Sequence, residues 1–514
     1  MSSNPSPRDA ALQAAAAIAS APTGLVAYNS QGRVAVVGAA EVVAAFCRGL
    51  SEQLQCSRVP VSPGKTPRDQ LRLDGHLGAF RLSLGGDDGA GTLLAEADMV
   101  VDLLGEGDTP LLDMTMPPFG YLLGDADPQH WSGLREQAGE LVGQFQKPRF
   151  FDYDPDICAH ARSGLEACRR CIDACPAEAI TSLAEKVSVD PYLCQGGGAC
   201  ATVCPTGAMR YMYPDPATTL DRLRTLITTY VAQTQQSPVL VLCDQVTLDT
   251  LQGHLPEHWL PMVQEELASV GIEVWLSALA YGAAAVVLAE PASLDAGVRT
   301  ALVEQSRIAD TLLAGMGYPE VVMLWSGDTQ PELAPMPARP AAGYAGMADK
   351  RQALYMALDH LYAHAPSPVA QTLLPQGAPL GQVLVDSDKC TLCMACASVC
   401  PAKALSAGGD TPRLDFHEAN CVQCGLCSQA CPESAISLQA RLIHDPEQRR
   451  ARRVLNEEAP FCCVSCGKAF ATSKVIERML DKLSGHWMYK DETARNRLKM
   501  CQDCRVIDMM KDTA

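Results

Sequence analysis

The sequence predicts a multidomain protein of mixed α/β and α+β class, in which cysteine-rich modules alternate with α/β domains. Three observations predict this class. The chain has 514 residues, enough for about three or four domains that each bury a core. Most of its 23 cysteines fall into three groups, at 158–204, 390–431 and 462–504. Between these groups, short apolar runs alternate with helical patterns, as is typical of α/β domains.

We expect six segments, each with its own composition. In chain order they are 1–150, an N-terminal α/β domain of unknown role; 151–213, the first cysteine-rich module; 214–345, an α/β domain; 346–380, a helix and Pro-rich linker; 381–437, the second cysteine-rich module; and 438–514, a four-cysteine module.

Composition and apolar runs bear on the cellular compartment. The chain is 47% hydrophobic and 19% charged, as globular proteins are. No basic segment precedes the Ala-rich run near the start, so we expect no secretory signal. No window reaches about 18 uncharged apolar residues, so we expect no membrane span. We therefore expect a cytoplasmic protein, because thiols stay reduced in the cytoplasm and clustered cysteines there most often hold metal.

The isolated cysteines and the histidines give no sign of a catalytic site. Cys47, Cys56 and Cys243 stand alone, and Cys462 is left over from the last group. A lone cysteine is most often a small buried hydrophobe, so we expect structural thiols at these positions. We expect His160, within CAHARS, and likewise His417 and His444, to be solvent-facing or hydrogen-bonded rather than catalytic.

Two runs share one cysteine spacing, CTLCMACASVCP at 390–401 and CVQCGLCSQACP at 421–432. This C-x2-C-x2-C-x3-C-P pattern resembles the bacterial dicluster ferredoxins. In that family three thiolates of one run bind one iron–sulfur cube, and the cysteine before proline reaches the neighbouring cube. The resemblance implies two [4Fe-4S] clusters. One is held by Cys390, Cys393, Cys396 and Cys431, and the other by Cys421, Cys424, Cys427 and Cys400.

The first group, CAHARSGLEACRRCIDACP at 158–176, resembles the same family but departs from its spacing. Leu165 stands where the first ligand is expected. Cys158, ten positions before Cys168, takes that place if the intervening loop bulges out. We therefore expect a complete [4Fe-4S] cluster on Cys158, Cys168, Cys171 and Cys204, the third complete cluster of the chain.

The run CQGGGACATVCP at 194–205 lacks one cysteine, because Gly197 occupies the position of the second ligand. Three thiols remain for the fourth centre: Cys175, Cys194 and Cys200. Such a site can hold a [3Fe-4S] cluster, or a cube whose fourth iron takes water or some other ligand; the alternative is an empty site. The loss of one thiolate charge would separate the reduction potential of this centre from the other three.

The third group forms two C-x2-C pairs, in CVSCGKAF at 463–470 and CQDC at 501–504, without a trailing Cys-Pro. Paired knuckles of this kind suit tetrahedral zinc in a zinc-ribbon-like module. The interval between the pairs is longer than in most zinc ribbons, so a further redox site is the alternative. The expected ligands are Cys463, Cys466, Cys501 and Cys504.

The segment 237–326 alternates apolar runs with helical patterns, which predicts a parallel sheet. On the words ALAYGAAAVVLAE and LLAGMGYPEVVMLW it resembles the delta subunit of methyl-viologen-reducing hydrogenases. That family binds a [2Fe-2S] centre through cysteines, and here only Cys243 is present. The cluster is therefore not carried over, and we expect a docking or spacing module.

The whole arrangement resembles bacterial multi-cluster ferredoxin-like proteins that accompany formate dehydrogenases. The words CAHARSG, CRRCIDACP, CATVCPTGAM and MCQDCRV carry this resemblance. It implies a molybdenum or tungsten dehydrogenase as the redox partner. The expected function is single-electron transfer between that enzyme and another redox protein. The alternatives are an assembly factor for such a formate dehydrogenase and a redox-sensing regulator.

Charge is distributed unevenly along the chain. The formal net charge is −18, but the tail from Ser437 onward has 15 Lys and Arg against 11 Asp and Glu. An acidic body steers association with basic faces of redox partners. We expect RRARR at 449–453 to be a solvated basic helix. Aromatic residues for base stacking are sparse in the tail, which disfavours nucleic acid as a partner.

Overall fold

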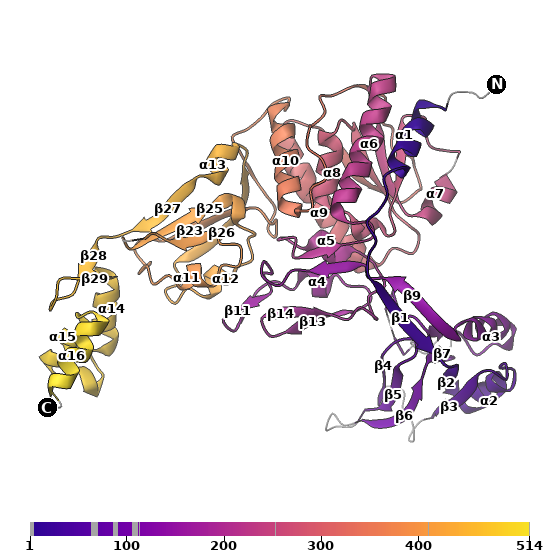
Figure 1. The fold of residues 1–514 in the computed structure, drawn as a ribbon, viewed down its shortest axis with the longest axis horizontal. Coiled ribbons are helices and arrows are strands. Elements are labelled where there is room, and N and C mark those ends of the chain that lie inside the picture. The colour runs from indigo at the N-terminus through magenta and orange to yellow at the C-terminus, as the bar shows by residue number, and fades with distance from the viewer. Residues whose placement is uncertain are drawn as a thin grey trace.

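A parallel four-stranded sheet covered by helices lies in the middle of the chain and of the molecule (Figure 1). The computed structural model describes residues 5–62, 70–85, 91–104, 111–112, 114–251, 253–409 and 411–512. The central strands run in the order β18-β17-β19-β20, and their pairings are parallel, which confirms the sheet predicted for 237–326. They are β17 (Val239–Cys243), β18 (Trp259–Val263), β19 (Ala285–Ala289) and β20 (Val322–Trp325).

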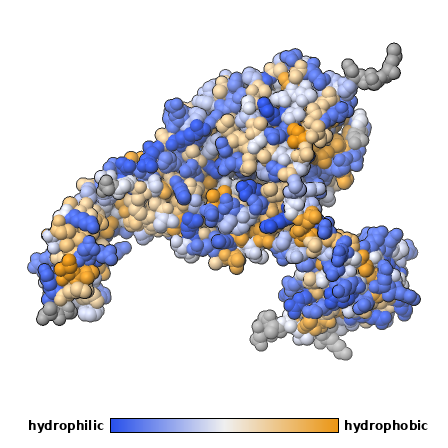
Figure 2. Space-filling view, viewed as in Figure 1, coloured by the Kyte–Doolittle hydropathy of each residue, from blue (hydrophilic) through white to orange (hydrophobic). Residues whose placement is uncertain are grey.

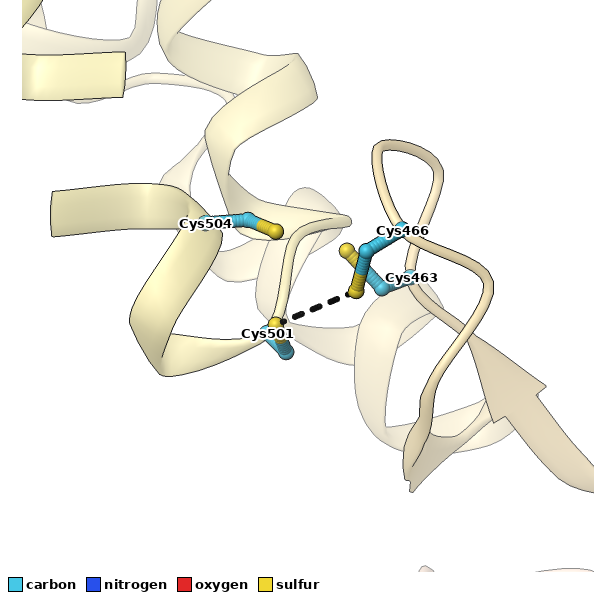
Figure 3. Close-up of side chains that lie close together, drawn as sticks. All are labelled: Cys463, Cys466, Cys501 and Cys504. Carbon is cyan, nitrogen blue, oxygen red and sulfur yellow. Dashed lines mark hydrogen bonds between the residues drawn. The ribbon is translucent and has the colours of Figure 1, made fainter. Parts of the chain in front are cut away.

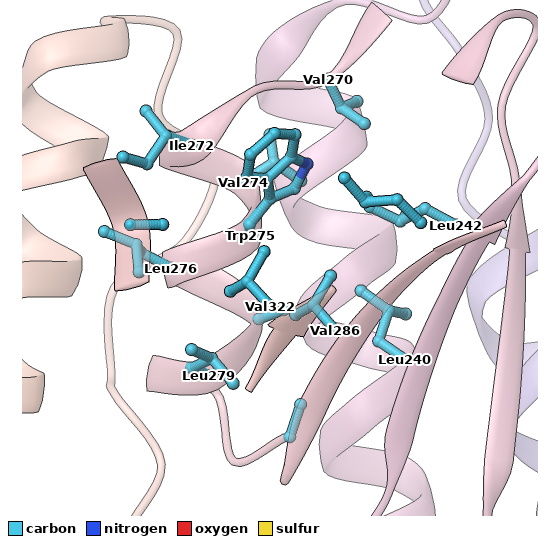
Figure 4. Close-up of a cluster of buried hydrophobic side chains, with 14 of the residues drawn as sticks. Leu240, Leu242, Val270, Ile272, Val274, Trp275, Leu276, Leu279, Val286 and Val322 are labelled. Carbon is cyan, nitrogen blue, oxygen red and sulfur yellow. The ribbon is translucent and has the colours of Figure 1, made fainter. Parts of the chain in front are cut away.

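Helices cover both faces of this sheet, so β17 and β19 are buried along their whole length. Figure 4 shows Trp275 of α8 among Leu240, Leu242 and Val286 of the strands, and these side chains are fully buried. The elements around the sheet are α6 (Pro216–Thr234), α7 (Gln245–Leu251), η3 (Leu267–Ser269), α8 (Ile272–Ala280), α9 (Ala296–Gly315), and a short pair of β16 (Gln236–Ser237) with β21 (Met336–Pro337).

The segment expected to be a linker, 346–380, is instead integrated into its neighbours. Its helix α10 (Lys350–Ala363) packs along α8 and adds Leu354, Leu358 and Leu361 to the central core. These residues recur at helical spacing on one face, which explains why the helix docks. Strand β22 (Gln371–Leu373) pairs with β26 of the second cysteine-rich module. The segment therefore connects two folded units rigidly.

The N-terminal helix α1 (Pro7–Ala16) packs against α6 of the central domain, away from the sheet that follows it. The N-terminal domain begins at β1 (Leu25–Ser30), which pairs antiparallel with β9 (Gly143–Pro148). Its main sheet has the order β3-β2-β7-β8, all parallel. The strands are β2 (Arg33–Ala39), β3 (Gln55–Val61), β7 (Met99–Asp102) and β8 (Tyr121–Leu123).

Helices α2 (Ala40–Arg48) and α3 (Trp131–Glu140) cover this sheet, η2 (Pro128–His130) leads into α3, and a meander packs on the other side. The meander consists of β4 (Leu71–Asp74), β5 (Phe80–Leu84) and β6 (Thr92–Ala97). Cys47 at the end of α2 and Cys56 in β3 form a disulfide, because α2 returns the chain to the start of β3. The prediction of two isolated thiols is therefore wrong. Cys243 is fully buried in β17, as predicted.

The two cysteine-rich modules are built alike, each from two antiparallel strand pairs and two one-turn helices. In the first, β10 (Phe151–Tyr153) pairs with β15 (Met209–Tyr211), and β13 (Ile180–Leu183) pairs with β14 (Lys186–Val189). In both modules each cysteine run leaves a strand and enters a short helix. In the first module these helices are α4 (Arg170–Asp173) and α5 (Ala199–Val203).

The second module repeats this plan and extends it. Strand β23 (Gly381–Val385) pairs with β26 (Ile436–Ile443), and β24 (Leu405–Ala407) pairs with β25 (Arg413–His417). A further strand, β27 (Arg452–Glu457), pairs with β25, so the fold continues past residue 437. The remaining elements are α11 (Ala395–Ser398), η4 (Glu418–Asn420), α12 (Leu426–Gln429) and α13 (Pro446–Arg450).

We expected the basic run at 449–453 to be a solvated helix. It is instead the end of α13 and the start of β27. Arg449 is 1% exposed and pairs with Asp359 of α10. Its guanidinium also lies 4.5 Å from the centre of the Tyr355 ring and donates to the Ile443 carbonyl oxygen at 2.8 Å. This arginine ties the second module to the central domain.

A C-terminal lobe ends the chain (Figures 1 and 2). It has one hairpin, β28 (Pro460–Cys462) with β29 (Ala469–Thr472), followed by helices. The helices are α14 (Ser473–Leu483), η5 (Trp487–Tyr489), α15 (Glu492–Leu498) and α16 (Gln502–Asp512). Among all helices of the described residues, none combines the length and apolar character needed to cross a membrane.

Candidate iron–sulfur and metal centres

The structure gathers the cysteines of the two modules into four sets, which we number along the molecule. Site 1 is Cys175, Cys194 and Cys200; site 2 is Cys158, Cys168, Cys171 and Cys204; site 3 is Cys400, Cys421, Cys424 and Cys427; site 4 is Cys390, Cys393, Cys396 and Cys431. Each set is the one expected from the spacing, with the cysteine before proline contributed by the other run of its module.

Site 4 shows how the cysteine spacing produces a pocket that all four thiols line. All four of its cysteines line one cavity, together with Leu392 and Met394. Leu392 and Met394 adopt left-handed backbone conformations, with φ of 55° and 63°, which curl the loop around the cavity. Of the four thiols, that of Cys393 is exposed. Site 4 therefore reaches the surface of the molecule.

Backbone N–H groups donate to the sulfurs of the cysteines that precede prolines. The Ala435 N–H lies 3.3 Å from Cys431 Sγ, the Ala404 N–H lies 3.2 Å from Cys400 Sγ, and the Met209 N–H lies 3.4 Å from Cys204 Sγ. Hydrogen bonds of this kind stabilise thiolate charge and tune the potential of a bound cluster. The same bond recurs in both modules, since both have the same local fold.

The chemistry of these sets suits an iron–sulfur cluster. Burial, and after it the charge of neighbouring thiolates, raises the pKa of Cys424 to about 11 and that of Cys396 to about 12. Thiolates gathered at one site repel one another unless a cationic core compensates their charge, and iron supplies that core.

Site 2 acquires Cys158 through an inserted hairpin. Strands β11 (Ala161–Arg162) and β12 (Leu165–Glu166) pair, so Leu165 points along the hairpin instead of serving as a ligand. His160 closes the neck of the hairpin: its carbonyl oxygen accepts the Ala167 N–H at 2.8 Å, and its Nδ1 lies 2.8 Å from the Cys168 carbonyl oxygen. Because this neck is closed, Cys158 lies beside Cys168.

His160 is 1% exposed, and its Nε2 lies 2.8 Å from the Ser182 hydroxyl. Both ring nitrogens therefore have partners, which confirms the expectation of a hydrogen-bonded histidine. Its structural role in closing the hairpin was not foreseen, although the residue lies within the word CAHARS.

Site 1 keeps a cavity although it has only three cysteines. Cys175, Cys194 and Cys200 line one cavity, as the four cysteines of site 4 do. Gly197, which replaces the missing cysteine, lines the same cavity. The three remaining thiols of site 1 therefore still face a common space, which is what a bound cluster requires.

The two modules meet at sites 2 and 3. The charge of Cys168 contributes to the raised pKa of Cys424, after burial and the thiolates of site 3 itself, so these thiols lie within electrostatic reach. The inserted strand β12 packs against α12, and Arg170 donates to the Gly377 carbonyl oxygen at 2.6 Å. The insertion that displaced the first ligand thus builds part of the contact between modules.

Arg351 of α10 bridges the modules at this contact. Its guanidinium donates to the carbonyl oxygen of Pro205, which follows the site 2 residue Cys204, at 3.3 Å. It also donates to the carbonyl oxygens of Cys421 in site 3 at 3.1 Å and Ala419 at 2.9 Å. The cysteine spacing did not predict a role for Arg351, because this residue lies on α10, which is distant in sequence from the cysteine runs.

The C-terminal lobe brings together the four cysteines expected to bind zinc (Figure 3). Cys463 and Cys466 lie in the hairpin loop, Cys501 precedes α16 and Cys504 lies within it. Their sulfurs all lie within 4.8 Å of one another, and those of Cys466 and Cys501 are 3.7 Å apart. A tetrahedral zinc with Zn–S bonds of ~2.3 Å separates its sulfurs by ~3.8 Å, so this set fits one ion.

The lobe differs from a zinc ribbon, because its second knuckle is the start of a helix and not a second hairpin. Helices α14 and α15 fill the long interval between the pairs. Burial raises the pKa of Cys463, but N–H donors of Cys501, Cys466 and Ser465 outweigh it and lower the pKa to about 6, which favours the thiolate. Cys462 is exposed, which contradicts the buried structural thiol that we expected.

A family model for the 4Fe-4S dicluster domain matches residues 166–208 and 389–435. The first match begins after Cys158, so the inserted hairpin precedes it. No curated protein matches the chain. The two matches support a protein of the iron–sulfur, ferredoxin-like class with an electron-transfer role. The matched segments lie within the two cysteine-rich modules, which are similar to 4Fe-4S dicluster domains.

Proposed function

We propose that this protein relays single electrons between a formate dehydrogenase-like enzyme and a second redox protein, in the cytoplasm. In this proposal sites 2, 3 and 4 hold [4Fe-4S] clusters, site 1 holds the fourth centre and the C-terminal set holds zinc. A bound iron–sulfur cluster accepts and donates one electron at a time. Oxidation of formate to carbon dioxide releases a proton and two electrons, which the relay would carry singly.

The observation that carries the proposal is the contact of site 2 with site 3. Within each module, thiols of the paired sites also lie close: Cys171 of site 2 affects the pKa of Cys200 in site 1, and Cys396 of site 4 affects that of Cys427 in site 3. The order is therefore site 1, site 2, site 3, site 4. Electron tunnelling falls steeply with distance, so a continuous row of centres supports a relay better than two separate pairs.

Arg351 supports the same order through its charge. Reduction adds a negative charge to a cluster, and a nearby guanidinium stabilises that added charge. Arg351 contacts the backbone of both facing sites, so its charge should stabilise the reduced state of clusters in sites 2 and 3. The exposed Cys393 places site 4 at the surface, where a redox partner can dock.

The proposal that the partner is a formate dehydrogenase rests on the sequence motifs that carry the resemblance. A stopped-flow experiment tests it directly. Oxygen-free protein is mixed with a formate dehydrogenase and formate in a stopped-flow spectrometer. A relay loses the visible absorbance of its clusters only when enzyme and substrate are both present. An assembly factor shows no such bleaching, and the dehydrogenase made without it is inactive. Bleaching that is absent with formate but present with another dehydrogenase would contradict the proposed partner alone.

A further inference from the structure

The glycine-rich loop of site 1, at 196–198, packs against residues from outside its own cysteine run at 194–205. A Cβ on Gly196 would lie 2.9 Å from the Phe150 ring, and one on Gly198 would lie 2.4 Å from Ser269 Cα. Both glycines also have positive φ, at 85° and 72°. The loop therefore needs these glycines for close packing, and its sequence fits a specific structure.

Between them, Gly197 faces a sulfur atom. A Cβ on Gly197 would lie 3.0 Å from Sδ and 3.5 Å from Cε of Met116, and 3.1 Å from Cγ of Pro176. Gly197 holds the position that Cys393 and Cys424 hold in the other runs. The thioether of Met116 thus lies next to the point from which the side chain of the missing cysteine would start, and it approaches from the N-terminal domain.

The backbone around Met116 holds the thioether there. The Met116 N–H donates to the carbonyl oxygen of Pro176, the residue after Cys175 of site 1, at 3.4 Å. The hydroxyl of Thr115 donates to Asp295 of the central domain at 2.5 Å. Pro117 and Pro118 follow and restrict the chain. The backbone of this loop is therefore anchored to two neighbours beside site 1.

We propose that Met116 is the fourth ligand of site 1, so that its thioether binds the fourth iron of a [4Fe-4S] cluster. Thioether sulfur is a soft ligand of the kind that iron–sulfur clusters accept. The inference rests on the proposed function only in requiring a cluster at site 1. It also gives the N-terminal domain a role, because that domain completes a centre of the neighbouring module.

A neutral thioether changes the electrostatics of site 1. The site has one thiolate fewer than its companions, and Lys147 adds a positive charge by donating to the carbonyl oxygens of Cys194 at 2.7 Å and Tyr192 at 2.8 Å. Fewer negative ligands and a nearby cation both favour the reduced cluster. Site 1 should therefore have the highest reduction potential of the four centres.

The test is EPR and Mössbauer spectroscopy of the oxygen-free full chain. Wild type should contain four cubes, and mild oxidation should not produce the EPR signal of a [3Fe-4S] cluster. Met116→Leu keeps the side-chain volume but removes the sulfur, so the same oxidation should convert one cube per chain to [3Fe-4S]. Met323→Leu, at a half-buried methionine on β20, is the matched control and should behave as wild type.

A second variant keeps the test decisive if Met116→Leu is poorly folded. Met116→Ala with Gly197→Cys removes the thioether and supplies a fourth thiolate in the space so opened. It should retain four cubes, and the potential of site 1 should fall towards those of the other three. A [3Fe-4S] cluster in wild type, only three cubes in wild type, or a Met116→Leu spectrum identical to wild type would overturn the ligand assignment while leaving the relay intact. Protein without any cubes would refute the relay as well.

Discussion

At the scale of single residues, the side chains that organise the centres lie outside the cysteine motifs. Arg351 donates hydrogen bonds to carbonyl oxygens of both modules, and His160 closes the hairpin that places Cys158 in site 2. Both act on backbone groups next to ligands. Their effect is to set where the cysteines lie, so each is a positioning residue.

Replacing Arg351 tests its role at the contact of sites 2 and 3. Arg351→Gln removes donors to four main-chain carbonyl oxygens, and each acceptor left unpaired costs about 1–3 kcal/mol. We expect the clusters to remain but electron transfer from site 2 to site 3 to slow. Flash reduction followed by absorbance measures that rate. Arg307→Gln, at an exposed position on α9, is the control; equal rates in both variants would refute the role of Arg351.

At the scale of elements, helices α10 and α13 join the second module to the central domain. Arg449 of α13 is buried against α10, where Asp359 is its ionic partner. The same guanidinium contributes, after burial, to lowering the pKa of the adjacent His444 to about 4. A neutral His444 and a paired Arg449 keep this interface free of uncompensated charge.

Breaking this pair should destabilise the joint between the domains. Asp359→Asn leaves Arg449 buried without its counter-ion, and such losses cost about 3–5 kcal/mol. Denaturant unfolding of the oxygen-free protein should show this loss. Arg450→Gln removes a cation whose side chain is 61% exposed and should cost less than about 1 kcal/mol. A similar small effect for both variants would contradict a buried ionic joint.

The C-terminal lobe should depend on its metal. Only a small core supports its helices, and binding of structural zinc contributes about 10–16 kcal/mol to folding in small zinc modules. A chelator should therefore abolish the helical signal of α14–α16 in circular dichroism and leave the cluster absorbance unchanged. Cys463→Ser should have the same effect and reduce zinc to none per chain. Cys462→Ser, beside it but exposed, is the control and should keep one zinc.

At the scale of the whole molecule, local spacing predicted more than distant contacts. In sites 3 and 4 three cysteines lie in one short loop, where the spacing keeps them close, whereas the fourth comes from the other run and was expected only from the resemblance to dicluster ferredoxins. The parallel sheet was also predictable, because its strands are continuous apolar runs. The integration of α10 and the pairing of β27 with β25 were not, since both depend on partners distant in sequence.

The contributions of Met116 and Arg351 to the sites likewise could not be predicted from the sequence. Neither residue belongs to a motif, and each approaches its site from another domain. The signal in the sequence was the missing cysteine at Gly197, which is compatible with a [3Fe-4S] cluster, with another fourth ligand or with an empty site. The Cys47–Cys56 disulfide could not be predicted from spacing, because it depends on α2 returning the chain to the start of β3.

The most direct test of the continuous row of centres is EPR of the fully reduced, oxygen-free protein. Two double variants each remove ligands from one facing site, Cys168→Ser with Cys171→Ser and Cys424→Ser with Cys427→Ser. If sites 2 and 3 face each other, the wild-type spectrum should show magnetic coupling between the modules that both variants lose. A wild-type spectrum that equals the sum of two independent modules would contradict the relay.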